Sequence, residues 1–297
     1  MTAAIATVGL TKSYGEGRGV FDLDLEVAEG EIFGFLGPNG AGKTTTICLL
    51  LDLIRPVRGR ASVLGHDCQS EGREVHRLTG YLPGEFALDS RLSGRDLLTY
   101  LANLRGGVDW SYVDRVVDQL DLDLDRPFGQ YSRGNKQKVG VAQAFMHRPR
   151  LLILDEPTSG LDPINQEAVL ALARDAHAEG ATIFFSSHVL SEVESVCQRV
   201  GFIRDGRLIR VGDVRELLAT RGYTIEADCV RPPDAAELTG LPGVTSATVN
   251  GGHVTLLIQG DMSAAISALA RCGVTSLVSR EPSLAEVFLG LYEGDPP

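Results

Sequence analysis

A nine-residue stretch, residues 37–45, constrains the fold of this chain most strongly. It fits the pattern G-x-x-x-x-G-K-[ST] and lies between a short apolar run, residues 32–36, and a run with helical spacing, residues 46–54. In this context glycine lets successive backbone N–H groups turn inward around phosphate oxygens, and the start of the helix adds partial positive charge. The sequence therefore predicts a phosphate-binding P-loop made of Gly37, Pro38, Asn39, Gly40, Ala41, Gly42, Lys43, Thr44 and Thr45.

A pair of acidic residues is expected at the same site. Residues 151–154 form a continuous apolar run, which is typical of a central parallel strand covered on both faces, and Asp155 and Glu156 end it. Open α/β sheets bind ligands at this edge. Lys43 would reach the β- and γ-phosphates, Thr44 and Asp155 would ligate Mg²⁺, and Glu156 would polarise the attacking water. A solvated acidic turn after a strand is the alternative.

Three further motifs occur in a fixed order around the acidic strand. They are YSRGNKQK at residues 131–138, SGLD at 159–162 and SSH at 186–188. With the P-loop, they make the chain from Ala3 to about Thr220 resemble the ATPase subunits of ATP-binding-cassette (ABC) transporters. The resemblance implies that two subunits sandwich two ATP molecules head to tail. Each ATP would meet the P-loop of one subunit and the signature loop of the other, here residues 131–135.

The resemblance assigns roles to single residues. Tyr14 matches the aromatic residue that stacks on adenine, and Ser132 and Gly134 match the signature residues that meet the partner's nucleotide. His188 matches a histidine that contacts the γ-phosphate, so the catalytic set is expected to be Glu156, His188 and Lys43.

Simpler interpretations of these residues stay open. Ser132 could be a plain N-cap of a helix over residues 135–145, and His188 an ordinary exposed histidine. Asp162 resembles a dimer-contacting aspartate of the family, but it could also cap a helix that begins at Pro163.

The chain departs from the family pattern at two loops. The signature carries Arg133 and Asn135 where the family usually has glycine and glutamine. Gly84 follows Pro83 where the family commonly has a glutamine that senses the metal and couples to the membrane subunit. Glycine can adopt positive φ, so Gly84 could act as a hinge, and Glu85 could partly replace the missing glutamine.

Length and composition suggest two domains. The 297 residues are 43% hydrophobic but only 6% aromatic, which favours an aliphatic α/β core. We expect a P-loop ABC cassette over residues 1–220, with a mixed sheet, an antiparallel β flank and a helical subdomain at about 85–148. A small α+β domain is expected over residues 221–297.

Hydrophobic spacing predicts the individual elements. The flank would be an antiparallel hairpin of residues 5–14 and 20–27. The other expected cassette elements are helices over 92–104, 112–120, 135–145 and 164–178 and strands over 151–154 and 182–185.

The C-terminal segment has its own pattern. Strands are expected over 223–230, 244–249, 254–258 and 274–278, with a helix over 263–271. One candidate arrangement is ferredoxin-like. The ending resembles that of ABC ATPases from the drug- and polymer-exporter branch. There Ser283 would cap a packing helix with Leu284, Val287, Phe288 and Leu291 on one face.

Charge and cysteine content narrow the functional classes. The formal net charge of −11 argues against nucleic acid as a partner, because phosphate contacts need a basic face. Five widely spaced cysteines indicate buried thiols in a reducing cytosol. No apolar stretch approaches 18 residues, so we do not expect the chain to cross a membrane by itself.

These observations together predict an ATP-hydrolysing subunit of a transporter, with an exporter favoured. It would bind ATP and Mg²⁺, pair with a second copy of itself, and sit on a separately encoded permease at the cytoplasmic face of the cell membrane. The alternative is a soluble ABC ATPase that regulates or remodels other molecules without transport. Such relatives usually carry two cassettes, a long coiled coil or a basic surface, and this sequence has none of these.

Overall fold

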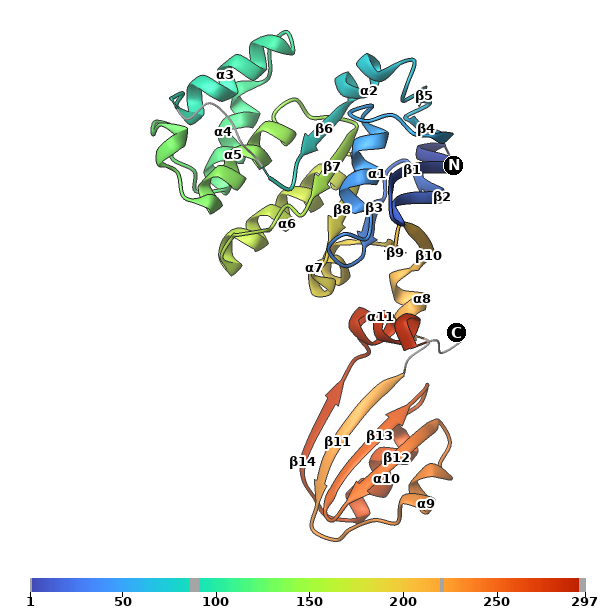
Figure 1. Ribbon diagram of the computed structural model, residues 1–297. Helices are drawn as coiled ribbons and strands as arrows, with labels where there is room; N and C mark the ends of the chain where they lie inside the picture. Colours follow the sequence, from blue (N-terminus) through green and yellow to red (C-terminus); the bar gives the residue numbers. More distant parts are fainter. Residues whose placement is uncertain (1, 86–90, 220–221, 294–297) are drawn as a thin grey trace. The chain divides into compact units, whose positions relative to one another are not determined.

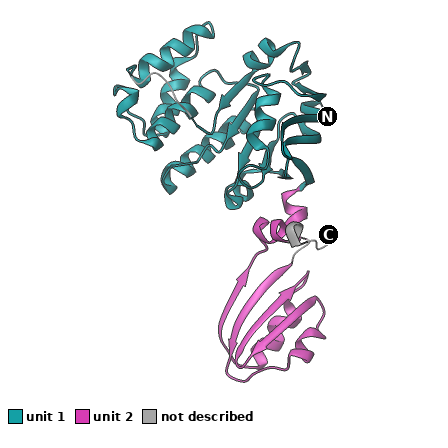
Figure 2. Ribbon diagram, viewed as in Figure 1, with its two compact units in different colours: residues 1–212 teal, residues 213–297 magenta. Residues whose placement is uncertain are grey.

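The computed structural model describes residues 2–85, 91–219 and 222–293. Within the chain two compact units can be distinguished, Met1–Gly212 and Asp213–Pro297 (Figure 2). Among the described residues, no helix combines the length and the apolar character that crossing a membrane requires.

A six-stranded sheet forms the centre of the first unit, with the strand order β10-β9-β3-β8-β7-β6. The pairs β3–β8, β3–β9, β7–β8 and β6–β7 are parallel, so the carboxyl ends of β3, β7 and β8 meet at one edge. The strands are β3 (Ile32–Leu36), β6 (Thr79–Leu82), β7 (Leu151–Asp155), β8 (Thr182–Ser187), β9 (Arg199–Arg204) and β10 (Arg207–Asp213).

An antiparallel sheet flanks this core, with the order β2-β1-β4-β5. Its strands are β1 (Ala3–Gly15), β2 (Arg18–Ala28), β4 (Arg58–Val63) and β5 (His66–Asp67). The predicted hairpin is therefore confirmed. Its second strand alternates buried Leu23, Leu25 and Val27 with exposed polar residues, because only one face of the sheet meets the core.

Helices cover the central sheet and build a separate layer. In Figure 1, α3, α4 and α5 lie together on the β6 side of the sheet, as expected for the helical subdomain. The helices of this unit are α1 (Lys43–Leu50), α2 (Gly72–Leu78), α3 (Gly94–Leu104), α4 (Trp110–Gln119), α5 (Arg133–Phe145), α6 (Pro163–Ala178) and α7 (Leu190–Val196), with a 3₁₀ turn at Phe128–Gln130. The structure places the start of α5 at Arg133, not at residue 135, because the first turn carries no apolar residue that periodicity could detect.

The second unit contains a four-stranded antiparallel sheet with the order β12-β13-β11-β14. Together with the chain order β-α-β-β-α-β, this is the ferredoxin-like arrangement. The elements are α8 (Val214–Ala219), β11 (Tyr223–Cys229), α9 (Ala235–Thr239), β12 (Val244–Asn250), β13 (His253–Ile258), α10 (Ser263–Arg271), β14 (Val274–Arg280) and α11 (Leu284–Glu293).

The final helix, α11, has the expected cap and apolar face. Glu286 N donates a hydrogen bond to Ser283 Oγ at 3.4 Å, and Leu284 and Val287 are buried. Phe288 is half-buried, and the side chain of Leu291 lies outside the described residues. The helix packs against α8.

The five cysteines are free thiols. Cys68, Cys197 and Cys229 are buried, as expected, whereas Cys48 and Cys272 are only partly buried. Burial raises the pKa of the Cys68 thiol to about 12.

Three aromatic rings anchor the centre of the main sheet. The Phe184 ring lies 6.0 Å from that of Phe33 and 5.2 Å from that of Phe35, and all three side chains are fully buried.

Phe184→Ala should therefore lower the free energy of unfolding of the first unit by about 3–5 kcal/mol, since it leaves a cavity between strands. Urea denaturation followed by the fluorescence of Trp110, the single tryptophan, measures this change. Tyr100→Ala, at a side chain that is 57% exposed, is the control and should change it by less than about 0.5 kcal/mol. Equal effects of the two substitutions would contradict the assignment of Phe184 to the core.

Candidate active site

The P-loop joins β3 to α1 and has the conformation that its glycines make possible. Gly40 and Gly42 have φ of 82° and 110°, in the left-handed region. A Cβ on Gly37 would lie 2.3 Å from the carbonyl oxygen of Ile203, so only glycine fits there. No side chain caps the N-terminus of α1, where Gly42 is the N-cap. Its first N–H groups are thus available to an anion.

Lys43 points into the loop that precedes it. The side chain is only 5% exposed. Its Nζ donates to the carbonyl oxygens of Gly37 at 2.7 Å and Pro38 at 3.3 Å, and it lies 3.4 Å from Glu156 Oε1. A buried ammonium group requires such partners, and the same geometry holds a positive charge beside the phosphate-binding backbone.

Asp155, at the end of β7, joins three elements. Thr44 Oγ1 on α1 donates to its Oδ2 at 2.7 Å, and Ser186 Oγ on β8 donates to its Oδ1. The residue is 1% exposed. A hydroxyl and a carboxylate oxygen in contact suit Mg²⁺, which prefers oxygen ligands and usually takes one or two protein groups plus phosphate and water. Thr44 and Asp155 therefore fit the ion that the sequence predicts.

Glu156 has an unusual backbone conformation. Its φ is 48°, in the left-handed region that a non-glycine residue adopts at a cost of about 1–3 kcal/mol. The backbone N–H donates to Ser186 O at 3.0 Å, and Oε1 lies 3.1 Å from His188 Nδ1. The three predicted catalytic residues, Lys43, Glu156 and His188, thus meet around one carboxylate. Nothing in the local sequence indicates the positive φ.

A cavity of about 450 Å³ lies over this arrangement. It is lined by Tyr14, Arg18, Gly19, Pro38, Asn39, Gly40, Gly42, Lys43, Thr44, Thr45 and Glu156. Tyr14 is 57% exposed, as a ring that stacks on a flat ligand would be, and Lys12 Nζ lies 5.7 Å from its centroid. Arg18 was missed at the sequence level, because one arginine at the start of a strand belongs to no motif.

Comparison with known proteins is consistent with this geometry. The ABC transporter family model matches residues 20–159. Over 99% of this chain and 98% of the relative, the sequence is 36% identical to the bacitracin transport ATP-binding protein BcrA of Enterococcus faecalis. The chain belongs to the ATP-binding subunits of ABC transporters. It is an ATPase that binds ATP and powers a transporter.

Other comparisons agree with this assignment. The daunorubicin resistance ATP-binding protein DrrA3 of Streptomyces coeruleorubidus is 35% identical over 98% of this chain and 96% of its own length. A second family model, the C-terminal domain of DrrA1-3-like ATP-binding proteins, matches residues 210–292. The predicted exporter-branch resemblance of the C-terminal segment is confirmed.

Solved structures confirm the predicted cassette fold. An ATP-binding subunit of an ABC transporter has a TM-score of 0.67 at 29% identity, covering 74% of this chain and 93% of that one. A dimeric ATP-binding cassette solved with ADP and Pi shares the fold, with a TM-score of 0.64 at 22% identity over 71% of this chain and 99% of that one.

The ABC signature residues lie away from the P-loop cavity of their own chain. Ser132 is exposed at the start of α5, where its Oγ accepts a hydrogen bond from Asn135 N at 3.2 Å, and neither it nor Gly134 lines the cavity. Asp162 caps α6 in the same way, accepting from Asn165 N at 3.0 Å. Ser132 and Asp162 are therefore helix caps, which is compatible with a further contact between either residue and another chain.

The departure at Gly84 has a different structural meaning from the one expected. Gly84 does not adopt positive φ here, so its backbone gives the hinge interpretation no support. Its position matters instead: a Cβ built on it would lie 3.5 Å from Asp155 Oδ2, at ordinary van der Waals distance. A small residue therefore borders the Asp155 carboxylate, and the neighbouring Glu85 is exposed.

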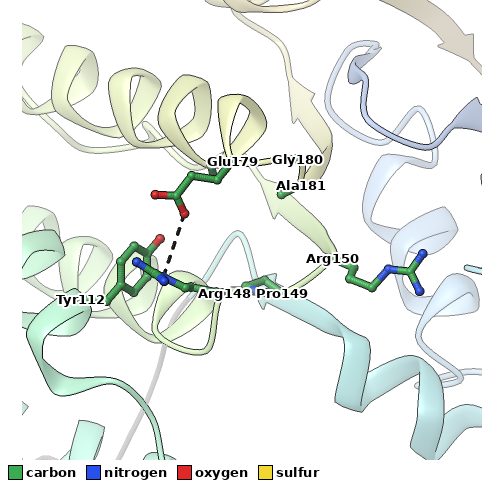
Figure 3. Close-up of a pocket in the computed structure, with 8 residues that line it drawn as sticks. Tyr112, Arg148, Pro149, Arg150, Glu179, Gly180 and Ala181 are labelled. Atoms are coloured by element: carbon green, nitrogen blue, oxygen red, sulfur yellow. Dashed lines mark ion pairs between the residues drawn. The ribbon is translucent and has the colours of Figure 1, made fainter.

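A second cavity, of about 470 Å³, is lined by Tyr112, Arg148, Arg150 and Glu179 among others (Figure 3). Its charges already have partners. Arg148 stacks 4.4 Å from the Tyr112 ring centroid and lies 4.0 Å from Glu179, while Arg150 pairs with Glu29 at 2.9 Å. Its lining includes no glycine-rich loop and no acidic strand end, unlike the cavity over the P-loop.

The geometry at Gly84 generates a stability prediction. Gly84→Gln should shift the melting temperature by no more than about 2 °C, since neither φ nor space opposes a side chain. Gly206→Gln is the matched control, because Gly206 has φ of 74° and its Cβ would lie 2.4 Å from the carbonyl oxygen of Gly19. The control should be clearly destabilised. Equal losses in thermal unfolding would show that Gly84 is constrained in a way that the structure does not account for.

Proposed function

We propose that this chain is the ATPase subunit of an exporter and that its P-loop cavity is the catalytic site. One observation carries the assignment of the site: Lys43, the Thr44–Asp155 pair and the Glu156–His188 pair converge where β3, β7 and β8 end. That edge is where α/β sheets bind ligands. The printed names of the relatives, bacitracin transport and daunorubicin resistance, support the direction of transport.

Each residue has a role in this proposal. Tyr14 stacks on adenine, and the loop from Gly37 to Thr45 binds the phosphates together with Lys43. Thr44 and Asp155 would hold Mg²⁺, which would supply charge neutralisation at the phosphates. Glu156 orients and polarises the attacking water, and His188 holds the Glu156 carboxylate and faces the γ-phosphate.

The complete site is proposed to need a second copy of the chain. Ser132 and Gly134 of that copy would meet the γ-phosphate, since Ser132 is exposed, Gly134 is partly exposed, and neither lines the cavity of its own chain. The pair would sit on a separately encoded permease at the cytoplasmic face of the membrane. The proposed domains are residues 1–220 and 221–297, with the helical subdomain at about 85–148, although the compact units divide slightly earlier, after Gly212.

The role of Glu156 is tested by its amide. Glu156→Gln should reduce steady-state phosphate release by at least about 100-fold, because the amide cannot polarise water, while binding of a fluorescent ATP analogue persists. Lys43→Ala should instead weaken the binding itself. Glu179→Gln, at an exposed glutamate beside the Figure 3 cavity, is the control and should keep normal turnover. Near-normal hydrolysis by purified Glu156→Gln protein would contradict the assignment.

The composite site is tested by mixing two inactive variants. A heterodimer of Ser132→Arg and Lys43→Ala subunits contains one site with both lesions and one intact site. An equimolar mixture should therefore regain up to about a quarter of the wild-type activity, while each variant alone stays inactive. Specific activity of the wild type should also fall on dilution. A monomer whose activity does not change on dilution, together with no recovery on mixing, would contradict the shared site.

A further inference from the structure

The loop that carries Glu156 is held by the first turns of α5. Gln137 is 5% exposed, and its Nε2 donates to the carbonyl oxygens of Glu156 at 3.3 Å and Pro157 at 3.2 Å. The Glu156 carbonyl also accepts from Ser159 N at 3.1 Å. A buried amide that donates hydrogen bonds to two adjacent carbonyls fixes the orientation of the peptide between them.

Two more contacts bring the same helix against the same loop. Arg133 Nη2 donates to Ser159 Oγ at 3.2 Å. A Cβ on Gly134 would lie 3.1 Å from the carbonyl oxygen of Gly160, so the backbones approach closely there. The contacts made by Arg133, Gly134 and Gln137 therefore cover the loop from Glu156 to Gly160.

These contacts determine where the Glu156 side chain points. The residue has positive φ, and both of its peptide groups are tied: the N–H to Ser186 O, and the carbonyl to Gln137 and Ser159. With both peptide planes fixed, the Cα–Cβ direction is fixed as well. The carboxylate then lies 3.4 Å from Lys43 Nζ and 3.1 Å from His188 Nδ1. Without the Gln137 amide, the carbonyl oxygen of Glu156 loses a buried hydrogen-bond donor.

We propose that Gln137 is a positioning residue for hydrolysis, which holds Glu156 in its productive orientation from the helix that also presents Ser132. The inference rests on the proposed role of Glu156. It adds that the helix presenting Ser132 to one nucleotide also sets the base at the other. A rotation of α5 would displace the carbonyls that Gln137 holds and so misdirect the carboxylate.

The test is Gln137→Met, which keeps the length of the side chain and removes its donors. We expect kcat for ATP hydrolysis to fall about 10- to 100-fold, because small misplacements of a reacting group have costs of this size. KM and the affinity for a fluorescent ATP analogue should stay within about twofold, because Gln137 does not line the cavity. Gln143→Met, the same change six residues further along α5, is the matched control and should keep kcat.

A double-mutant cycle separates positioning from general structural support. In single-turnover measurements, Gln137→Met should slow hydrolysis much less in the Glu156→Gln background than in the wild type, since the group that it positions is already lost. If Gln137→Met protein fails to melt cooperatively, Gln137→Asn serves instead. Its amide is withdrawn by one methylene group and should give the same fall in kcat.

The outcomes are distinguishable. Unchanged kcat in the Gln137 variant, or an equal loss in both backgrounds, would overturn the positioning role. If Glu156→Gln itself hydrolyses ATP normally, the proposed function fails first. If Glu156→Gln is inactive while the Gln137 variant is normal, only the present inference fails.

Discussion

The hydrogen bonds that the Asp155 carboxylate accepts from Thr44 and Ser186 hold the site together. They join the first turn of α1, the end of β7 and the end of β8 at one buried point. A carboxylate that is 1% exposed is costly unless it is hydrogen-bonded or paired, so either lost hydroxyl would leave a penalty of several kcal/mol. The position of the P-loop relative to the acidic strand, and with it the catalytic arrangement, depends on this contact.

The parts of the site that could be predicted are those whose chemistry is local. The P-loop is specified by glycines at φ values that other residues avoid, and β7 by an apolar run that ends in two carboxylates. Family resemblance then supplied Tyr14 and His188, and the structure places both at or beside the cavity. The ferredoxin-like topology could be named only as a candidate, because strand order depends on pairings that the local pattern does not contain.

Other features depend on contacts between distant segments. Thr44 and Asp155 are 111 residues apart in the chain, and Gln137 and Glu156 are 19 apart. Glu156 has positive φ at a point where Ser186 and Gln137 hydrogen-bond its peptide groups, and its local sequence gives no sign of it. At Gly84, by contrast, the sequence suggested a positive φ that the structure does not contain. Glycine permits positive φ but does not require it, and here its significance is its proximity to Asp155.

Ser132 and Gln137, at the start of α5 and about one turn further along it, differ in their exposure to solvent. Ser132 is exposed, whereas Gln137 is buried against the loop that carries Glu156, and a rise of 1.5 Å per residue puts them about 7.5 Å apart along the axis. A hydrogen-bonded helix does not compress over such a distance, so a displacement at Ser132 reaches Gln137 almost undiminished. In a dimer with shared sites, the nucleotide bound by one copy would therefore act on the base of the other. In such a dimer no long pathway would be required, because α5 would contact one site through Ser132 and already contacts the Glu156 loop through Gln137.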